Sequence, residues 1–232
     1  MKLSIVVPIY NEKETLRMLL ERVRQAPYDK EIILVEDCST DGTREIVKML
    51  AKEDPSLKCV FHDKNMGKGK ALASGFKEVS GDVVIIQDAD LEYDPAEYPV
   101  ILAPILDGRA DVVYGSRFLG SPQRVHLFWH FVGNRMFTLF SNIFTNINLN
   151  DMETCYKAFK ASLLSRFSIR SRRFGVEPEI TAKFARMKCK IYEVAISYSG
   201  RDYSEGKKIG WKDGLAAFYW IIYYNLINRK MH

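Results

Sequence analysis

Three acidic side chains, Asp88, Asp90 and Glu92, stand close together in the chain. They directly follow the four apolar residues 83–86, whose composition is typical of a parallel strand buried on both faces. Carboxylates this close repel one another unless a cation lies between them, and a hydrated divalent ion on a phosphorylated ligand suits that position. The cluster therefore indicates a site for a metal-bound phosphorylated ligand. The alternative interpretation is that the acids simply end a strand in solvent.

The elements that must position this cluster alternate along the first half of the chain. Such alternation predicts βαβ units and a largely parallel sheet, whose strands end in loops along one ligand-binding edge. Apolar runs and helical spacing give the bounds. We predict strands at 3–7, 31–35, 58–61, 83–86 and 111–114, and helices at 14–25, 43–51, 71–79 and 95–106.

Several of the predicted loops carry side chains that suit a nucleotide. Tyr10 and Glu12 follow the first strand, Glu36 and Asp37 follow the second, and Arg117 follows the fifth. A tyrosine ring can stack on a base, and carboxylates can accept hydrogen bonds from a base or a ribose. Any one of these residues could be a solvated loop residue or a helix cap. Together they favour a nucleotide site.

Two common nucleotide-binding patterns are absent from the sequence. No glycine-rich dinucleotide fingerprint follows the first predicted strand, and no P-loop pattern occurs. The glycine-containing turn 65–70, which includes Lys68, is a weaker signal for phosphate binding at a helix start.

The composition is that of an ordinary globular protein. Hydrophobic residues make up 47% and charged residues 27% of the 232 residues, and the net charge is +5. The basic residues are spread along the chain, so we expect no nucleic-acid partner. No apolar stretch reaches the roughly 20 residues of a spanning helix, so we expect the chain not to cross a membrane.

The pattern changes beyond residue 120. A long helix with a broad aromatic side is predicted at 125–147, then a helix near 178–187, a strand at 190–194 and an aromatic helix at 211–227. No repeat or linker separates the two halves, so we predict a single domain over residues 1–232.

Five stretches resemble, in this order, the motifs of family 2 glycosyltransferases with the GT-A fold. Within that family, residues 151–157 and 201–209 resemble the later motifs of the polyprenyl-phosphate glycosyltransferases, the group of dolichol-phosphate mannose and glucose synthases. The resemblance implies an α/β, Rossmann-like, mostly parallel sheet flanked by helices, with amphipathic helices toward the C-terminus. The five stretches are residues 8–12, 36–43, 65–69, 88–92 and 115–117.

The resemblance implies inverting transfer of a hexose from a nucleotide diphosphate sugar, of the UDP-glucose or GDP-mannose type, to a polyprenyl phosphate. Residues 1–120 would bind the donor and residues 121–232 the acceptor. Asp88, Asp90 and Glu92 would hold Mg²⁺ or Mn²⁺. We assign phosphate or catalytic roles to Asp90, Arg117, Arg135 and Arg201, and donor binding to Pro8, Tyr10, Glu12, Glu36, Asp37, Lys68, Asp88 and Lys207.

The acceptor decides whether a base is needed. A phosphate acceptor is already ionised near neutral pH and requires only cations. A sugar hydroxyl would need a base, for which Asp151 and Glu153 are the candidates, unless they form a helix end or a structural ion pair. Two other functions stay open: the same fold with a saccharide or other soluble acceptor, and a nucleotide-sugar-binding protein without turnover.

A lipid acceptor requires contact with a membrane. We expect a cytoplasmic protein held peripherally on the membrane surface by the aromatic segments 128–144 and 218–224. Alternatively, these segments pack on the core or on a second subunit of a homo-oligomer. Basic residues that could add attraction to anionic lipid are Arg166, Arg170, Arg172 and Arg173.

Overall fold

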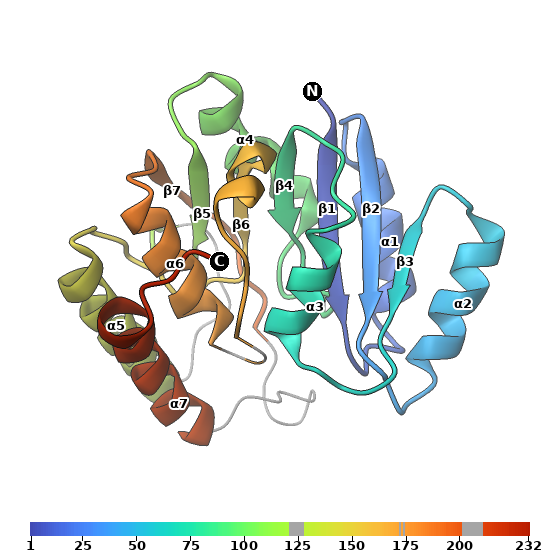
Figure 1. Ribbon diagram of the computed structural model, residues 1–232. Coiled ribbons are helices and arrows are strands. Elements are labelled where there is room, and N and C mark those ends of the chain that lie inside the picture. Colours follow the sequence, from blue (N-terminus) through green and yellow to red (C-terminus); the bar gives the residue numbers. More distant parts are fainter. Residues whose placement is uncertain (121–127, 172, 174, 201–210) are drawn as a thin grey trace.

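A single sheet runs through the computed structural model, which describes residues 1–120, 128–171, 173, 175–200 and 211–232. Among these residues seven strands pair in the order β3-β2-β1-β4-β6-β5-β7 (Figure 1). The strands are β1 (Leu3–Ile9), β2 (Lys30–Glu36), β3 (Lys58–Phe61), β4 (Val83–Ile86), β5 (Val112–Ser116), β6 (Lys157–Lys160) and β7 (Ile191–Ala195).

The predicted largely parallel sheet is confirmed. Strands β3, β2, β1 and β4 are parallel neighbours, and β5 is parallel to β7. Strand β6 runs antiparallel between β4 and β5 and was not predicted. Its four residues begin with the fully buried Lys157, and a buried charge hides the apolar pattern by which a strand is recognised.

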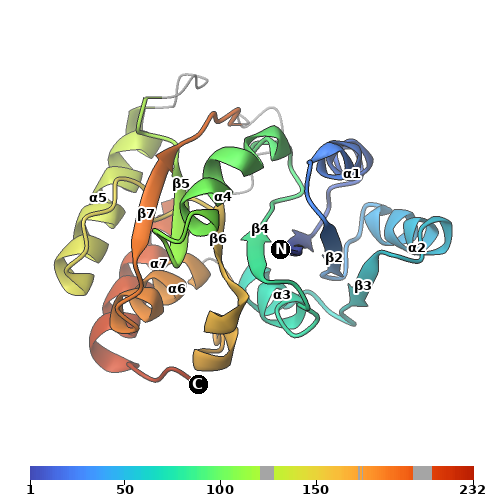
Figure 2. The same ribbon diagram turned by 90° about the horizontal axis from the view of Figure 1, so that it is seen from above.

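Helices cover both faces of the sheet (Figure 2). Because side chains alternate along β1, Ile5 and Val7 pack with Leu16 of α1 on one face, whereas Val6 packs with Ala71 of α3 on the other. Helices α1 (Leu16–Gln25), α2 (Thr43–Glu53) and α4 (Tyr98–Leu106) lie on the first face, and α3 (Lys68–Gly75), α6 (Val176–Arg186) and α7 (Trp211–Ile222) on the second.

Three of the predicted helices differ in detail. Helix α3 begins at Lys68, so residues 68–70 of the predicted turn belong to the helix. Its Gly75 packs so closely on Val6 that an added Cβ would lie 2.5 Å from that side chain. The helix predicted at 95–106 starts as a 3-10 turn (Pro95–Glu97). The last predicted helix, 211–227, ends in a π-helical turn (Tyr223–Ile227).

Helix α5 (Phe128–Thr145) packs against α6 and α7 rather than against the sheet. The buried side chains on it are those of Thr138 and Ser141, whereas Phe128 and Trp129 are 67% and 77% exposed. Helix α5 therefore turns Thr138 and Ser141 inward, with the half-buried Phe137 and Phe140 beside them, and exposes the aromatic side chains near its start. Among the described residues, no helix combines the length and the apolar character needed to cross a bilayer.

Candidate functional site

The loops that follow β1, β2, β4 and β5 lie along one edge of the sheet, at its lower side in Figure 1. Because β1 is parallel to both β2 and β4, the segment after Ile9 lies between those that begin at Glu36 and Gln87. The structure therefore brings the predicted donor-binding and acidic residues together.

Lys68 is the buried cation of the acidic cluster. Its Nζ lies 2.8 Å from Oδ1 of Asp88 and 3.4 Å from Oε1 of Glu177, at the start of α6. Glu177 also pairs with Nζ of the buried Lys157 at 3.1 Å. Burial alone would raise the pKa of Asp88, but the charge of Lys68 lowers it, so Asp88 is ionised near neutral pH. Two ammonium groups thus balance two carboxylates.

The rest of the acidic cluster makes different contacts. Oδ1 of Asp90 accepts the N–H of Glu92 at 3.1 Å, and Oε2 of Glu92 accepts the hydroxyl of Tyr198 at 2.6 Å. No three His, Cys, Asp or Glu side chains of the described part of the chain are grouped as ligands of one metal ion. Mg²⁺ and Mn²⁺ on a diphosphate need only one or two carboxylates, because phosphate oxygens and water complete the shell. The residues present fit such an ion, because Asp90 and Glu92 supply carboxylates of the kind that it needs.

Asp37 orders the loop that precedes α3. Its Oδ1 accepts the N–H of Met66 at 2.9 Å and lies 2.6 Å from Nδ1 of His62, and its Oδ2 accepts the N–H of Gly67 at 2.7 Å. The other ring nitrogen of His62 lies 2.9 Å from Oγ of Ser74. Asp37, which is predicted to bind the nucleoside, therefore also connects the ends of β2 and β3 to the start of α3.

Glu36 is buried and holds its own loop. It accepts the N–H of Ser39 at 2.6 Å and pairs with Arg44 at 2.8 Å.

The predicted donor-binding residues of β1 and its loop differ in exposure. Pro8 lies within β1, and Glu12 is buried with its carboxylate 3.0 Å from the Thr15 hydroxyl. Tyr10 is 38% exposed. The ring of Tyr10 thus remains accessible to a base, whereas Glu36 stabilises the loop.

Three non-glycine residues at this edge have left-handed backbone conformations. Asn11 has φ 54°, Cys38 has φ 59° and Leu91 has φ 63°. Each lies in a loop that follows a strand of the site. Such conformations cost free energy and are concentrated where a structure positions functional groups.

Arg117 forms a two-pronged ion pair with Asp151. Its Nε and Nη2 each lie 2.7 Å from a carboxylate oxygen of Asp151, and its backbone N–H donates to the same carboxylate at 3.0 Å. The guanidinium also lies 5.2 Å from the centre of the Tyr198 ring. Of the ion-pair and base hypotheses for Asp151, the structure supports the ion pair, because this fully buried carboxylate is occupied by Arg117.

Glu153 differs from the other buried acids. Its Oε1 is buried and has no hydrogen-bond partner within the described part of the chain. Burial and the nearby Glu177 raise the pKa of Glu153 to about 8, so its carboxyl is mostly protonated at pH 7. Arg135, which is exposed on α5, reaches the carbonyl of Asn150 at 3.5 Å and no other hydrogen-bond partner among the residues that the structure describes. Arg201 and Lys207 lie outside the described residues.

Sequence reasoning missed four residues of this edge. His62 directly follows β3, and its place at the end of a strand was the available signal. Glu177 gave no signal, because it looks like an ordinary surface charge until the fold buries it, and Lys157 was marked only as the last residue of the stretch 151–157. The fourth residue, Tyr198, follows β7, whose position beside β5 is decided by sheet topology.

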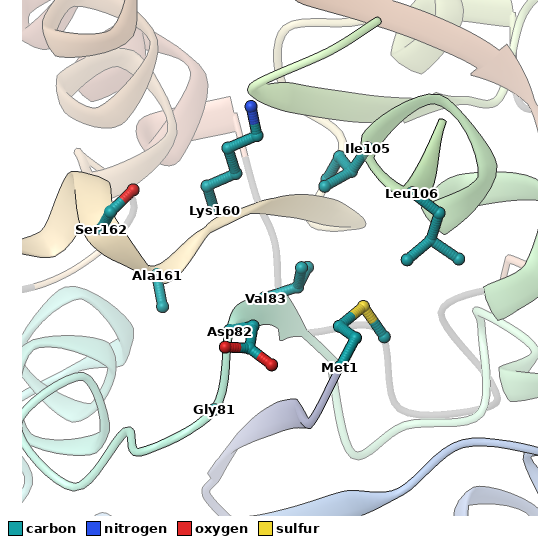
Figure 3. A pocket seen from close by; sticks show the side chains of 9 residues that line it. All are labelled: Met1, Gly81, Asp82, Val83, Ile105, Leu106, Lys160, Ala161 and Ser162. Carbon is teal, nitrogen blue, oxygen red and sulfur yellow. The ribbon is translucent and has the colours of Figure 1, made fainter. Parts of the chain in front are cut away.

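A separate hollow of about 530 Å³ lies near the opposite edge, around the amino ends of β1 and β4 (Figure 3). Met1, Asp82 and Lys160 line it. Lys160 pairs with Asp111 at 2.8 Å, and Asp82 accepts the N–H of Lys2. These contacts are structural, and the acidic cluster follows the other end of β4.

The sheet topology and the polar loops at its carboxyl edge define an α/β protein with a candidate ligand site at that edge, and sequence similarity gives its family. Residues 4–168 match the family described as glycosyl transferase family 2. The chain belongs to this family and is a glycosyltransferase.

Two relatives match most of the chain. The undecaprenyl-phosphate mannosyltransferase of Micrococcus luteus is 31% identical over 220 residues, which cover 90% of this chain and 88% of the relative. The undecaprenyl-phosphate 4-deoxy-4-formamido-L-arabinose transferase of Yersinia enterocolitica is 30% identical over 213 residues, 89% of this chain and 62% of the relative. The chain thus spans less than two thirds of the second relative.

A solved structure shares the fold. Glucosyl-3-phosphoglycerate synthase of Mycobacterium tuberculosis, crystallised with Mn²⁺, UDP and glucosyl-3-phosphoglycerate, superposes with a TM-score of 0.73 and 19% identity over 97% of this chain and 80% of that one. The predicted GT-A fold is confirmed.

Proposed function

We propose that this glycosyltransferase moves a hexose from a nucleotide diphosphate sugar to a polyprenyl phosphate, with inversion at the anomeric carbon. Two relatives whose names specify undecaprenyl phosphate support this acceptor. The observation that carries the proposal is the outward aromatic face of α5, because a lipid acceptor has to be taken from a membrane surface.

Different residues of the site would bind the nucleoside, the metal ion and the phosphate. Tyr10 and Asp37 bind the nucleoside, and Asp90 holds Mg²⁺ or Mn²⁺ on the donor diphosphate. The ion, when bound, neutralises charge that develops on the leaving group. Arg117 presents its guanidinium to phosphate. Among the described residues none accepts a hydrogen bond from Nη1 of Arg117, which supports its use for a ligand oxygen.

The state of the two candidate bases supports a phosphate acceptor. Asp151 is committed to Arg117, and Glu153 is mostly protonated at pH 7. Neither is then well suited to take a proton from a hydroxyl at that pH, and a phosphate oxygen needs no such help.

A hydroxyl acceptor is the second candidate. A carboxyl whose pKa is about 8 ionises partly at mildly alkaline pH, so Glu153 could then act as a base. In that case transfer to a saccharide would rise with pH through 8, and the Glu153→Gln enzyme would lose this rise.

The test is transfer from radiolabelled UDP-glucose, GDP-mannose and related donors to short polyprenyl phosphates, with Mg²⁺ or Mn²⁺, followed by organic extraction. We expect label in the lipid phase with one donor and none with the Asp90→Ala variant. Label confined to a water-soluble saccharide would refute the lipid acceptor. Nucleotide binding without transfer to any acceptor would instead indicate a binding protein.

A further inference from the structure

Glu193, on the edge strand β7, holds the turn that carries Asp151. Its carboxylate accepts the N–H of Asn150 at 2.8 Å and the N–H of Asp151 at 3.0 Å. It also accepts the side-chain amide of Asn150 at 2.9 Å. One carboxylate thus fixes both the backbone and a side chain of this turn, from a strand more than 40 residues further along the chain.

The same turn delivers the carboxylate that grips Arg117. Asp151 donates its N–H to Glu193 and directs both carboxylate oxygens to the guanidinium, at 2.7 Å each. A fork with two parallel bonds fixes the plane of the guanidinium as well as its position. The order of contacts is therefore Glu193, then the backbone at Asp151, then the Asp151 carboxylate, then Arg117.

The charges make this arrangement more than a packing contact. Glu193 has no Lys or Arg partner among the described residues, and burial together with the nearby Asp151 raises its pKa. A partly buried carboxylate without a cation is costly unless amides satisfy it. This cost arises at the turn that positions Asp151. In the described part of the chain, the only cation that pairs with Asp151 is Arg117.

We infer that Glu193 is a positioning residue for transfer, which acts through the Asn150–Asp151 turn to hold Arg117 at the angle required by a phosphate oxygen; this inference rests on the proposed function. Arg117 follows β5, and β5 pairs in parallel register with β7, so that Tyr114 lies opposite Glu193. The pairing of these strands places Glu193 on the strand next to the one that leads into Arg117.

A double-mutant cycle tests the inference on the full chain. Glu193→Gln keeps the size of the side chain but gives the turn an amide in place of one acceptor oxygen. We expect kcat/KM for polyprenyl phosphate to fall about tenfold, because small errors in placing a catalytic group are costly. In an Asp151→Asn background, the same substitution should cause no further loss, since its effect passes through Asp151.

Two controls separate positioning from general damage. Tyr192 lies on the same strand, and its ring contacts the guanidinium of Arg109. The Tyr192→Phe variant should leave kcat/KM unchanged. Binding of UDP and GDP with Mn²⁺, measured by calorimetry, should stay within about twofold in Glu193→Gln, because the nucleoside loops are on other strands. A tenfold loss that persists in the Asp151→Asn background would overturn the inference, as would unchanged kcat/KM in the single variant.

Failure of the proposed function would look different. If Arg117→Ala transfers sugar as well as the unmodified protein, the role of Arg117 itself is wrong. If Arg117→Ala is inactive and Glu193→Gln is fully active, the role of Arg117 stands and only the inference about Glu193 fails.

Discussion

Nζ of Lys68 lies 2.8 Å from Oδ1 of Asp88, and each of these side chains is less than one fifth exposed. The first acid of the cluster is therefore already matched by a cation supplied by the chain itself. For this reason we propose Asp90, rather than Asp88, as the main protein ligand of the metal ion. We also expect Lys68 to contribute to the stability of the fold.

Removal of Lys68 should destabilise the fold. Lys68→Met leaves Asp88 and Glu177 without this partner, and breaking a buried ion pair typically costs about 3 kcal/mol or more. We expect this loss in the free energy of unfolding, measured in urea. Lys68→Met/Asp88→Asn should recover part of it. Lys70→Met, on the same helix, is the control, and an equal loss there would contradict the explanation.

Asp90 and Asp88 should differ in their effect on metal-dependent binding. We expect Asp90→Asn to lower the affinity for UDP or GDP in the presence of Mn²⁺ by at least about tenfold, because it removes a ligand charge from the ion. With EDTA present, this variant and the unmodified protein should bind nucleotide alike. Asp88→Asn should have the smaller effect, since Lys68 already neutralises Asp88. Calorimetric titration decides, and the reverse order would disprove the assignment.

Glu153 should make stability fall as the pH rises. Its folded pKa of about 8 lies above the ordinary value of 4.5, so the folded protein retains a proton that the unfolded chain releases between these two values. In this window the unfolding free energy decreases by about 1.4 kcal/mol per pH unit from this group alone. The stabilising contribution of the protonated Glu153 carboxyl is fully present below pH 4.5 and lost above pH 8.

Glu153→Gln, which cannot ionise, tests this dependence. The variant should gain melting temperature relative to the unmodified protein, and the gain should be larger at pH 8 than at pH 5. A difference that is the same at both pH values would show that Glu153 does not titrate in this range.

The outer face of α5 should bind membranes. Trp129 and Ile143 are 77% and 63% exposed, and burial of a large apolar side chain contributes roughly 1.5–3 kcal/mol. Trp129→Ser/Ile143→Ser should therefore reduce binding to anionic vesicles by at least about tenfold in flotation, with little change in melting temperature. The control is Met18→Ser/Met49→Ser, on α1 and α2, where the two apolar side chains are 47% and 46% exposed. If the unmodified protein does not float with anionic vesicles, the membrane hypothesis fails.

The sequence by itself determined the sheet class, the edge at which the site lies and the acidic cluster. Local patterns carry this information, since apolar runs mark strands β1, β2 and β4. Because these strands are parallel, the polar residues that follow them lie at the same edge of the sheet. A structural ion pair was one of the alternatives for Asp151, but its partner, Arg117, was not predicted.

Only the tertiary structure decided which charges neutralise one another. Lys68, Glu177 and Lys157 come from α3, α6 and β6, and nothing in their local sequence shows that they meet. The position of β6 between β4 and β5 depends on long-range strand pairing. The same holds for Glu193, whose carboxylate accepts the N–H of Asp151. Charges separated by many residues interact only when the fold buries them side by side, where water no longer screens them.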